Sequence, residues 1–236
     1  AVAAPWLLSQ GLISGGQLFA FIAVLSLVVM LGAWNIDDRV PTTAIVQDGN
    51  AELLRIYPLL LTAFLMLFLE AGLTYWLPSL LSASASGEGI AAAYMSQFFF
   101  WFVIVRLSAA ALATWVTTLG FALCGLVGIS LSLGAVLVGA VALADTSFTG
   151  AFMGLIFPNA YAWMLKTGGG GTSTGARVLL SAIAGATVGP WVLGWILPIG
   201  GQASVLWVLG LVSTLAATVM VITELNARKY RSMRSQ

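Results

Sequence analysis

The chain has 236 residues, of which 60% are hydrophobic and only 7% are charged, and its net charge is +1. Soluble domains carry roughly 25% charged residues, so this composition excludes a water-soluble globular protein. Because the chain has no histidine and a single cysteine, it also excludes a histidine-based catalytic triad, a catalytic metal site and an internal disulfide. We therefore expect no enzymatic activity, no metal and no cofactor.

Hydropathy predicts an all-α integral membrane protein with seven spans, because each apolar run can cross a bilayer as a helix of about 20 residues. The loop 35–52 is the longest polar connector and the predicted boundary between two bundles, and 225–236 forms a basic tail. The glycine-rich stretch 166–175 predicts a flexible linker; it lacks the GxxxxGK[ST] pattern of a phosphate-binding loop. In chain order the predicted spans are 11–34, 54–81, 91–115, 117–139, 142–165, 176–199 and 203–224.

The basic residues predict the orientation of these spans. The tail contains four of the nine, and the loops on the opposite side contain Glu88 and Asp145 but no lysine or arginine. By the positive-inside rule the basic side is cytoplasmic, so we expect a cytoplasmic C-terminus, an extracytoplasmic N-terminus and a location in the cell membrane. Besides the tail and Arg106, the basic residues flank the two loops on the tail side: Arg39, Arg55, Lys166 and Arg177.

FLMLFLEAGLTYWLP, residues 64–78, places Glu70 near the middle of the second predicted span. An acidic residue at the bilayer centre costs roughly 2.5–3.5 kcal/mol to insert, and loss of hydration disfavours its charged form. A carboxyl that faces a cavity there is suited to carry a proton or to bind a polar solute. The alternative is a neutral carboxyl that only bonds a neighbouring helix, although serine or threonine would serve for packing at a lower cost.

Arg106 is the one basic residue well inside a predicted span. It lies about nine residues from the end of its helix, or roughly 13 Å at 1.5 Å per residue. It could pair with Glu70, bind a solute, or extend its stem to the cytoplasmic headgroups. The sequence leaves these roles open.

Two amides and three aromatic residues are further candidates. Gln97 and Asn159 either contact a solute or bond across helices, which is worth roughly 1 kcal/mol. Pro158 removes a backbone hydrogen bond just before Asn159, so we predict a kink that could line a cavity. Trp76, Tyr161 and Trp163 could stack on a sugar ring or lie at the membrane interface, and the interface is favoured for Trp76.

Small residues spaced four apart allow two helices to approach closely. We interpret these pairs as packing positions, which could also slide during a conformational change. The pairs are Gly11/Gly15, Gly150/Gly154 and Gly185/Gly189.

Four stretches together resemble the second half of a major facilitator superfamily transporter, closest to the fucose-permease-like sugar:proton symporters. The first is the spacing of Glu70 and Trp76, after a long cytoplasmic loop. The likeness covers about residues 50–224, with Val105 in place of the glycine found in that branch. The other three stretches are SQFFFWFVIVRL, GAFMGLIFPNA and GATVGPWVLGWILPIGG.

This resemblance implies alternating access, in which two six-helix bundles rock around a midplane site and a proton gradient or a co-substrate drives the cycle. It implies that Glu70 couples protons or binds sugar hydroxyls, that Trp76 lies near the extracellular entrance, and that Asn159 lies beside a gate helix. The gate or kink positions that it implies are Pro158, Gly154, Gly189 and Pro190.

The same resemblance makes 1–34 the last helix of an N-terminal bundle and 53–224 a six-helix C-terminal bundle. Since five helices would precede 1–34, we expect the chain to be a fragment or to need a partner chain. The expected partners are a small polar solute, a proton and the lipid bilayer, and we expect no nucleic acid.

Other classes fit less well. A retinal protein needs a lysine in the middle of its last helix, whereas Lys166 and Lys229 lie at span ends, and the receptor triplet Asp-Arg-Tyr and NPxxY are missing. A non-transporting scaffold or half-transporter stays open as the alternative, with an unfamiliar seven-span receptor behind it.

Overall fold

The computed structural model describes residues 49–83, 87–112, 115–168 and 171–234, all of which belong to one compact unit, Asp48–Gln236. Within these ranges the chain is entirely helical apart from short turns, and it contains no strand. The all-α prediction is therefore confirmed for the described part. The predicted span 11–34 and nearly all of the loop 35–52 lie outside the described residues, so the count of seven spans stays a prediction.

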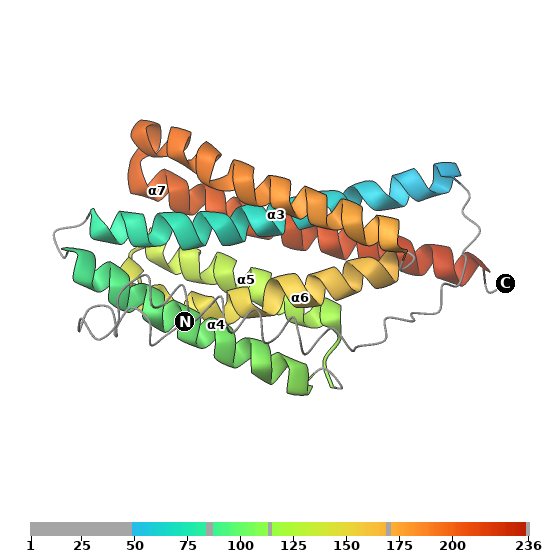
Figure 1. Ribbon diagram of the computed structural model, residues 1–236, viewed down its shortest axis with the longest axis horizontal. Coiled ribbons are helices and arrows are strands. Elements are labelled where there is room, and N and C mark those ends of the chain that lie inside the picture. The colour runs from blue at the N-terminus through green and yellow to red at the C-terminus, as the bar shows by residue number, and fades with distance from the viewer. Residues whose placement is uncertain (1–48, 84–86, 113–114, 169–170, 235–236) are drawn as a thin grey trace, which may run out of the picture. The chain divides into compact units, whose positions relative to one another are not determined.

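The described helices cover the last six predicted spans (Figure 1). Most predicted boundaries lie within about five residues of the observed ones, but the last helix continues to Arg234, ten residues beyond its predicted end at 224, and α6 begins at Thr149, after η1, rather than at 142. The elements are α3 (Gly49–Ser82), α4 (Gly87–Leu112), α5 (Thr118–Leu137), the 3₁₀ helix η1 (Leu143–Phe148), α6 (Thr149–Thr167) and α7 (Thr172–Arg234).

Helix α7 consists of two arms. At Gly201 the backbone has φ 68° and ψ −167°, a region that side chains with a Cβ rarely adopt. Figure 1 shows the chain turning back on itself within α7, which separates a first arm, 172–200, from a second arm, 202–234. These arms match the two predicted spans 176–199 and 203–224.

Four helices of the described part are long and apolar enough to cross a membrane, which supports a membrane location. Helix α6 is not among them, because Asn159, Tyr161 and Lys166 lower its hydropathy. The four are Ile56–Ser82, Gly89–Ala109, Thr118–Leu137 and Thr172–Lys229, the last of which contains both arms of α7.

The connection between α6 and α7 is shorter than predicted. We expected a flexible linker over 166–175, but α6 runs to Thr167 and α7 begins at Thr172. Thr174 is buried, and its hydroxyl lies 3.5 Å from the Gly168 carbonyl oxygen. Helix formation at both ends of the stretch therefore leaves only the connector 168–171.

Helix α3 packs against both arms of α7, and this contact forms the centre of the described core. A Cβ at Gly72 would come within 2.8 Å of Leu193 on the first arm and 2.7 Å of Leu209 on the second. The buried face of α3 repeats every three or four residues, as expected of a helix that buries one stripe. The fully buried positions of this stripe are Leu59, Thr62, Ala63, Leu69, Leu73 and Leu77.

Glycines hold the first arm of α7 against α3, in what we call the α3–α7 seam. A Cβ at Gly185 would clash with the backbone oxygen of Phe64, and one at Gly189 would lie 2.7 Å from the backbone oxygen of Phe68. The hydroxyl of Ser181 donates to the Leu60 carbonyl at 2.8 Å. The packing predicted for Gly185/Gly189 is thus confirmed.

The second glycine pair works in the same way at the α4–α6 seam. A Cβ at Gly150 would clash with the backbone oxygen of Phe98, and one at Gly154 would lie 2.5 Å from the backbone oxygen of Phe102. The packing prediction for this pair is confirmed as well. The pair Gly11/Gly15 lies outside the described residues.

A third seam joins α5 to the second arm of α7 through hydroxyl groups. Ser213 donates to the Leu126 carbonyl at 2.7 Å, and the hydroxyls of Ser130 and Thr214 lie 3.3 Å apart. We call this contact the α5–α7 seam.

Replacing a seam glycine should destabilise the bundle. We expect Gly185→Ala or Gly150→Ala to lower the free energy of unfolding by about 1–3 kcal/mol, because the new methyl group meets rigid backbone. Unfolding in detergent, followed by circular dichroism, measures the change.

Gly134→Ala and Gly210→Ala are the matched controls, since a Cβ at either position has no neighbouring atom within 4 Å. They should be neutral or slightly stabilising, because alanine favours helix more than glycine does. Equal losses in all four variants would contradict the close approach at the seams.

Candidate functional site

Helix α3 places Glu70 beside its buried stripe. The side chains of Leu69 and Leu73 are fully buried, whereas Glu70 is half-buried at the edge of the stripe. Thr74 donates to the backbone carbonyl of Glu70 at 2.8 Å, and this bond does not involve the Glu70 carboxyl group. The position near the middle of an apolar helix, predicted from the sequence, is what the structure shows.

The carboxyl of Glu70 reaches the surface of the described bundle. Within the described ranges it forms no hydrogen bond, and there no fully buried side-chain oxygen or nitrogen lacks a partner. Its oxygens are therefore at least partly exposed. The carboxyl is thus open to whatever covers this face of α3.

Arg106 on α4 lies within electrostatic reach of Glu70. Measured from the turn between α3 and α4 at 1.5 Å per residue, Glu70 lies about 18 Å along α3 and Arg106 lies about 28 Å along α4. The guanidinium carbon lies 4.8 Å from the ring centroid of Phe102, a cation–π contact, and the side chain is exposed. No hydrogen bond joins Arg106 to Glu70, so the two charges influence each other at a distance rather than as a direct pair.

Trp76 has its polar group occupied by the α3–α7 seam. Its indole Nε1 donates to the Pro190 carbonyl at 3.0 Å, and its ring packs against Gly194, where a Cβ would lie 3.3 Å away. The edge of Tyr75 meets the Trp76 ring at a centroid distance of 5.3 Å. Trp76 and the predicted gate position Pro190 are therefore brought together, and Gly189 lies next to them in the chain.

Gln97 belongs to a polar cluster at the Gly150 end of the α4–α6 seam. Its Oε1 accepts a hydrogen bond from Ser147 at 2.8 Å. One turn away, the hydroxyl of buried Tyr94 lies 3.4 Å from that of Thr146 and 3.5 Å from that of Thr149. Sequence reasoning missed these hydroxyl partners; the only signal available was the run of serine and threonine after Asp145.

On α6, Asn159 bonds to its own helix. Asn159 donates from Nδ2 to the Leu155 carbonyl at 2.7 Å, one turn back on its own helix. The helix continues through Pro158, so the predicted kink stays a prediction. Tyr161 stacks on Phe157, with ring centroids 5.9 Å apart, and its hydroxyl approaches Gly175 at the start of α7.

A polar cluster around one carboxylate joins α6 to the second arm of α7, and the sequence did not indicate it. Trp163 donates from Nε1 to one oxygen of Glu224 at 3.0 Å, and Arg228 donates from Nε to the other at 2.8 Å. Trp163 is buried and Arg228 is exposed, so the cluster joins the core to the basic end of α7.

A groove of about 510 Å³ lies on the α5–α7 seam, and none of the predicted site residues lines it. Within the described ranges, no three histidine, cysteine or acidic residues lie close enough to hold a metal ion. The chemistry suggested by the sequence therefore concentrates at Glu70 and Arg106, beside the two glycine seams and apart from the groove.

Protein-family models, curated proteins and solved structures were all compared with this chain, and none of them matches it.

Replacing Trp76 tests its part in the α3–α7 seam. We expect Trp76→Phe to lower the free energy of unfolding by about 0.5–1.5 kcal/mol, because the Pro190 carbonyl loses its indole donor. Detergent unfolding monitored by circular dichroism gives the value. Trp191→Phe, at a side chain that is 65% exposed, is the control and should be nearly neutral. A larger loss for Trp191→Phe than for Trp76→Phe would contradict the assignment.

Proposed function

We propose that this protein is a secondary active transporter that moves a small polar solute, such as a sugar, across a membrane by alternating access coupled to protons. The observation that carries the proposal is the accessible, unpartnered carboxyl of Glu70 in the middle of a membrane-length helix. A carboxyl at that depth can gain and lose a proton during a transport cycle where water reaches it.

Contact of this carboxyl with lipid tails is disfavoured. Insertion at the bilayer centre costs roughly 2.5–3.5 kcal/mol, and a lipid-facing carboxyl would recover none of it. Intramembrane acidic residues accordingly face a bundle interior or a water-filled cavity. The accessible face of α3 at Glu70 is therefore best assigned to a polar cavity, which a further group of helices would complete.

The pairing of helices also supports a transporter. If the six helical segments are counted in chain order, with each arm of α7 as one, the seams join the first to the fifth, the second to the fourth and the third to the sixth. Exchanging the first three segments with the last three leaves this pairing unchanged. Inverted repeats of three helices, as found in many transporters, have this property.

Within this proposal the residues take different roles. Glu70 carries the proton, and Arg106 sets its charge or contacts the solute. Asn159 and Gln97 each use one amide atom, Nδ2 of Asn159 within its own helix and Oε1 of Gln97 with Ser147, so each keeps its other amide atom for a solute. Gln97, Trp76 and Tyr161 shape the walls through their bonds and stacking contacts. The basic tail side is the cytoplasmic one, and the membrane is the cell membrane.

Chemical labelling tests the polar cavity without knowledge of the solute. In a Cys124→Ser background, we expect Glu70→Cys to react with a charged, water-soluble thiosulfonate, because water reaches this position. Leu131→Cys is the control, because its side chain is 69% exposed on the apolar outer face of α5 and should meet lipid instead.

Mass spectrometry of the protein in nanodiscs measures both reactions. We expect the reaction at position 70 to be at least tenfold faster, which corresponds to a free-energy difference of about 1.4 kcal/mol. Equal and slow labelling at both positions would contradict a water-filled cavity at Glu70.

Transport itself is tested in proteoliposomes that contain a pH-sensitive dye. We expect addition of one member of a panel of neutral sugars to alter the internal pH, and Glu70→Gln to abolish that signal because glutamine cannot exchange a proton. Glu70→Asp keeps the carboxyl and should retain part of the signal. Proton movement that is unchanged with glutamine would disprove the role of Glu70, and no response to any sugar would favour a scaffold.

A further inference from the structure

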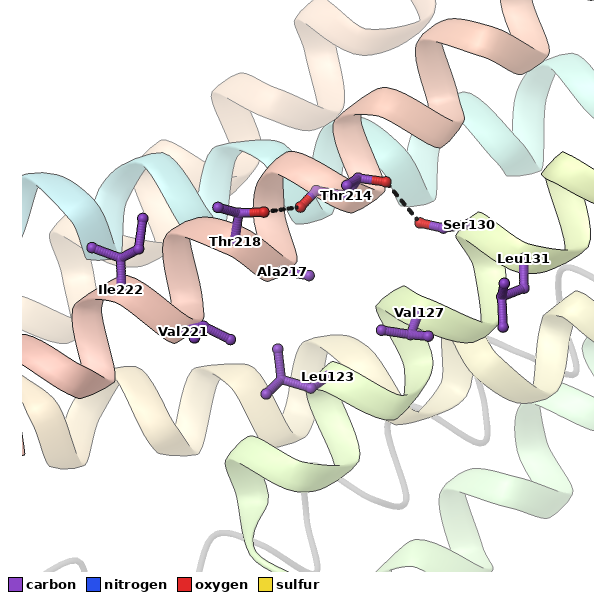
Figure 2. Close-up of a pocket in the computed structure, with 9 residues that line it drawn as sticks. All are labelled: Leu123, Val127, Ser130, Leu131, Thr214, Ala217, Thr218, Val221 and Ile222. Carbon is purple, nitrogen blue, oxygen red and sulfur yellow. Dashed lines mark hydrogen bonds between the residues drawn. The ribbon is translucent and has the colours of Figure 1, made fainter.

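The groove on the α5–α7 seam is formed where two helices diverge. Ser130 and Thr214 hold α5 and the second arm of α7 together at one end, and the groove opens from there toward Leu123 and Ile222 (Figure 2). It follows α5 for about 12 Å, from Leu123 to Leu131, at 1.5 Å per residue. The lining residues are Leu123, Val127, Ser130, Leu131, Thr214, Ala217, Thr218, Val221 and Ile222.

The hydroxyl groups of this groove already have partners. Thr218 donates to the Thr214 carbonyl at 2.8 Å, and the Ser130 hydroxyl lies 3.3 Å from that of Thr214 (Figure 2). Thr214 donates to the Gly210 carbonyl at 2.9 Å. A polar solute would thus find few free groups to bind. The remaining surface is aliphatic and suits a flexible hydrocarbon chain.

The groove also opens outward along membrane-length helices. Val127 is 49% and Ile222 is 53% exposed, although both belong to helices that are long and apolar enough to span a bilayer. On an outward face of such helices the surrounding medium is hydrocarbon. An acyl chain is therefore the occupant that the location supplies.

A basic residue, Arg228, lies beyond the open end of the groove on the face of the second arm that lines it. Steps of four and three residues lead from Thr214 through Thr218, Val221 and Leu225 to Arg228, which places them on one face of the second arm. Arg228 donates one hydrogen bond to Glu224, yet 68% of its side chain is exposed, and arginine has four further N–H donors. Lys229 follows it in the chain. This end of the groove is complementary to a phosphate group.

We propose that the groove between α5 and the second arm of α7 binds an anionic phospholipid, with one acyl chain along Val127 and Val221 and its phosphate at Arg228. The site is independent of the transport proposal and depends only on the membrane location. Basic positions between membrane helices are a common way to hold such headgroups.

Photocrosslinking in nanodiscs tests the site. The probe is phosphatidylglycerol with a diazirine in the middle of one acyl chain, and labelled peptides are mapped by mass spectrometry. We expect label to concentrate in residues 118–137 and 202–234, and unlabelled phosphatidylglycerol to compete about fivefold better than phosphatidylcholine, the effect of one basic contact.

Groove and headgroup variants separate the two parts of the site. Val127→Phe fills the groove and should lower labelling about fivefold, whereas Leu180→Phe, at an exposed position away from the groove, should not change it. Arg228→Gln should remove the preference for phosphatidylglycerol, and Arg228→Lys should retain it. Ala217→Leu is a second groove-filling variant, for use if Val127→Phe does not give monodisperse protein.

Three outcomes would overturn the proposal. Label spread evenly over the outward faces of α4, α5 and α7 would show lipid contact without a site. Labelling unchanged by both groove-filling variants would exclude the groove. Absence of label from both residues 118–137 and residues 202–234, in nanodiscs where other segments are labelled, would show that no phospholipid occupies the groove.

Discussion

Close approach of helix backbones is the constraint on which the rest of this structure depends. In a bilayer the apolar side chains gain little by leaving lipid, so helices associate through packing and hydrogen bonds. Here Gly185 and Gly189 allow the first arm of α7 to lie on the carbonyl groups of α3, and Gly150 and Gly154 do the same for α6 on α4. The large partners at these crossings are phenylalanines, whose backbone oxygens are the atoms nearest to the glycines. The two seams thereby fix the positions of both α3 and α4.

The two charges of the candidate site lie beside these crossings. Glu70 follows Phe68 by two residues, and Arg106 follows Phe102 by four, so each charge is within about one turn of a glycine contact. A tight crossing holds the helix that carries the charge in place while the charged group itself stays accessible. This separation of tasks explains why Trp76 and Gln97 use their polar groups for helix contacts, with Pro190 and Ser147, while Glu70 uses none within the described residues.

The third seam differs because it depends on hydroxyl groups instead of glycine backbone contacts at the point where its helices meet. The contacts of Ser130 with Thr214 and of Ser213 with the Leu126 carbonyl hold the helices together, and beyond them α5 and the second arm of α7 diverge. Larger separation leaves a groove that aliphatic side chains line but do not fill. The same bundle therefore has closely packed glycine seams near its charges and an open seam on an outward face, and the two kinds of surface suit different ligands.

The sequence by itself determined the helical class, the approximate bounds of the last six helical segments, the glycine packing pairs and the unusual positions of Glu70 and Arg106. These follow from local composition, because length, hydropathy and residue spacing are properties of one segment. Only the tertiary structure decided which helices the glycines join, that Trp76 bonds to Pro190, that Ser147, Tyr94 and Glu224 form polar clusters, and where the groove lies. Helices that are apolar on all sides carry no strong periodicity to show which face is buried. Their partners are set by contacts between distant segments, which no single stretch of sequence reveals.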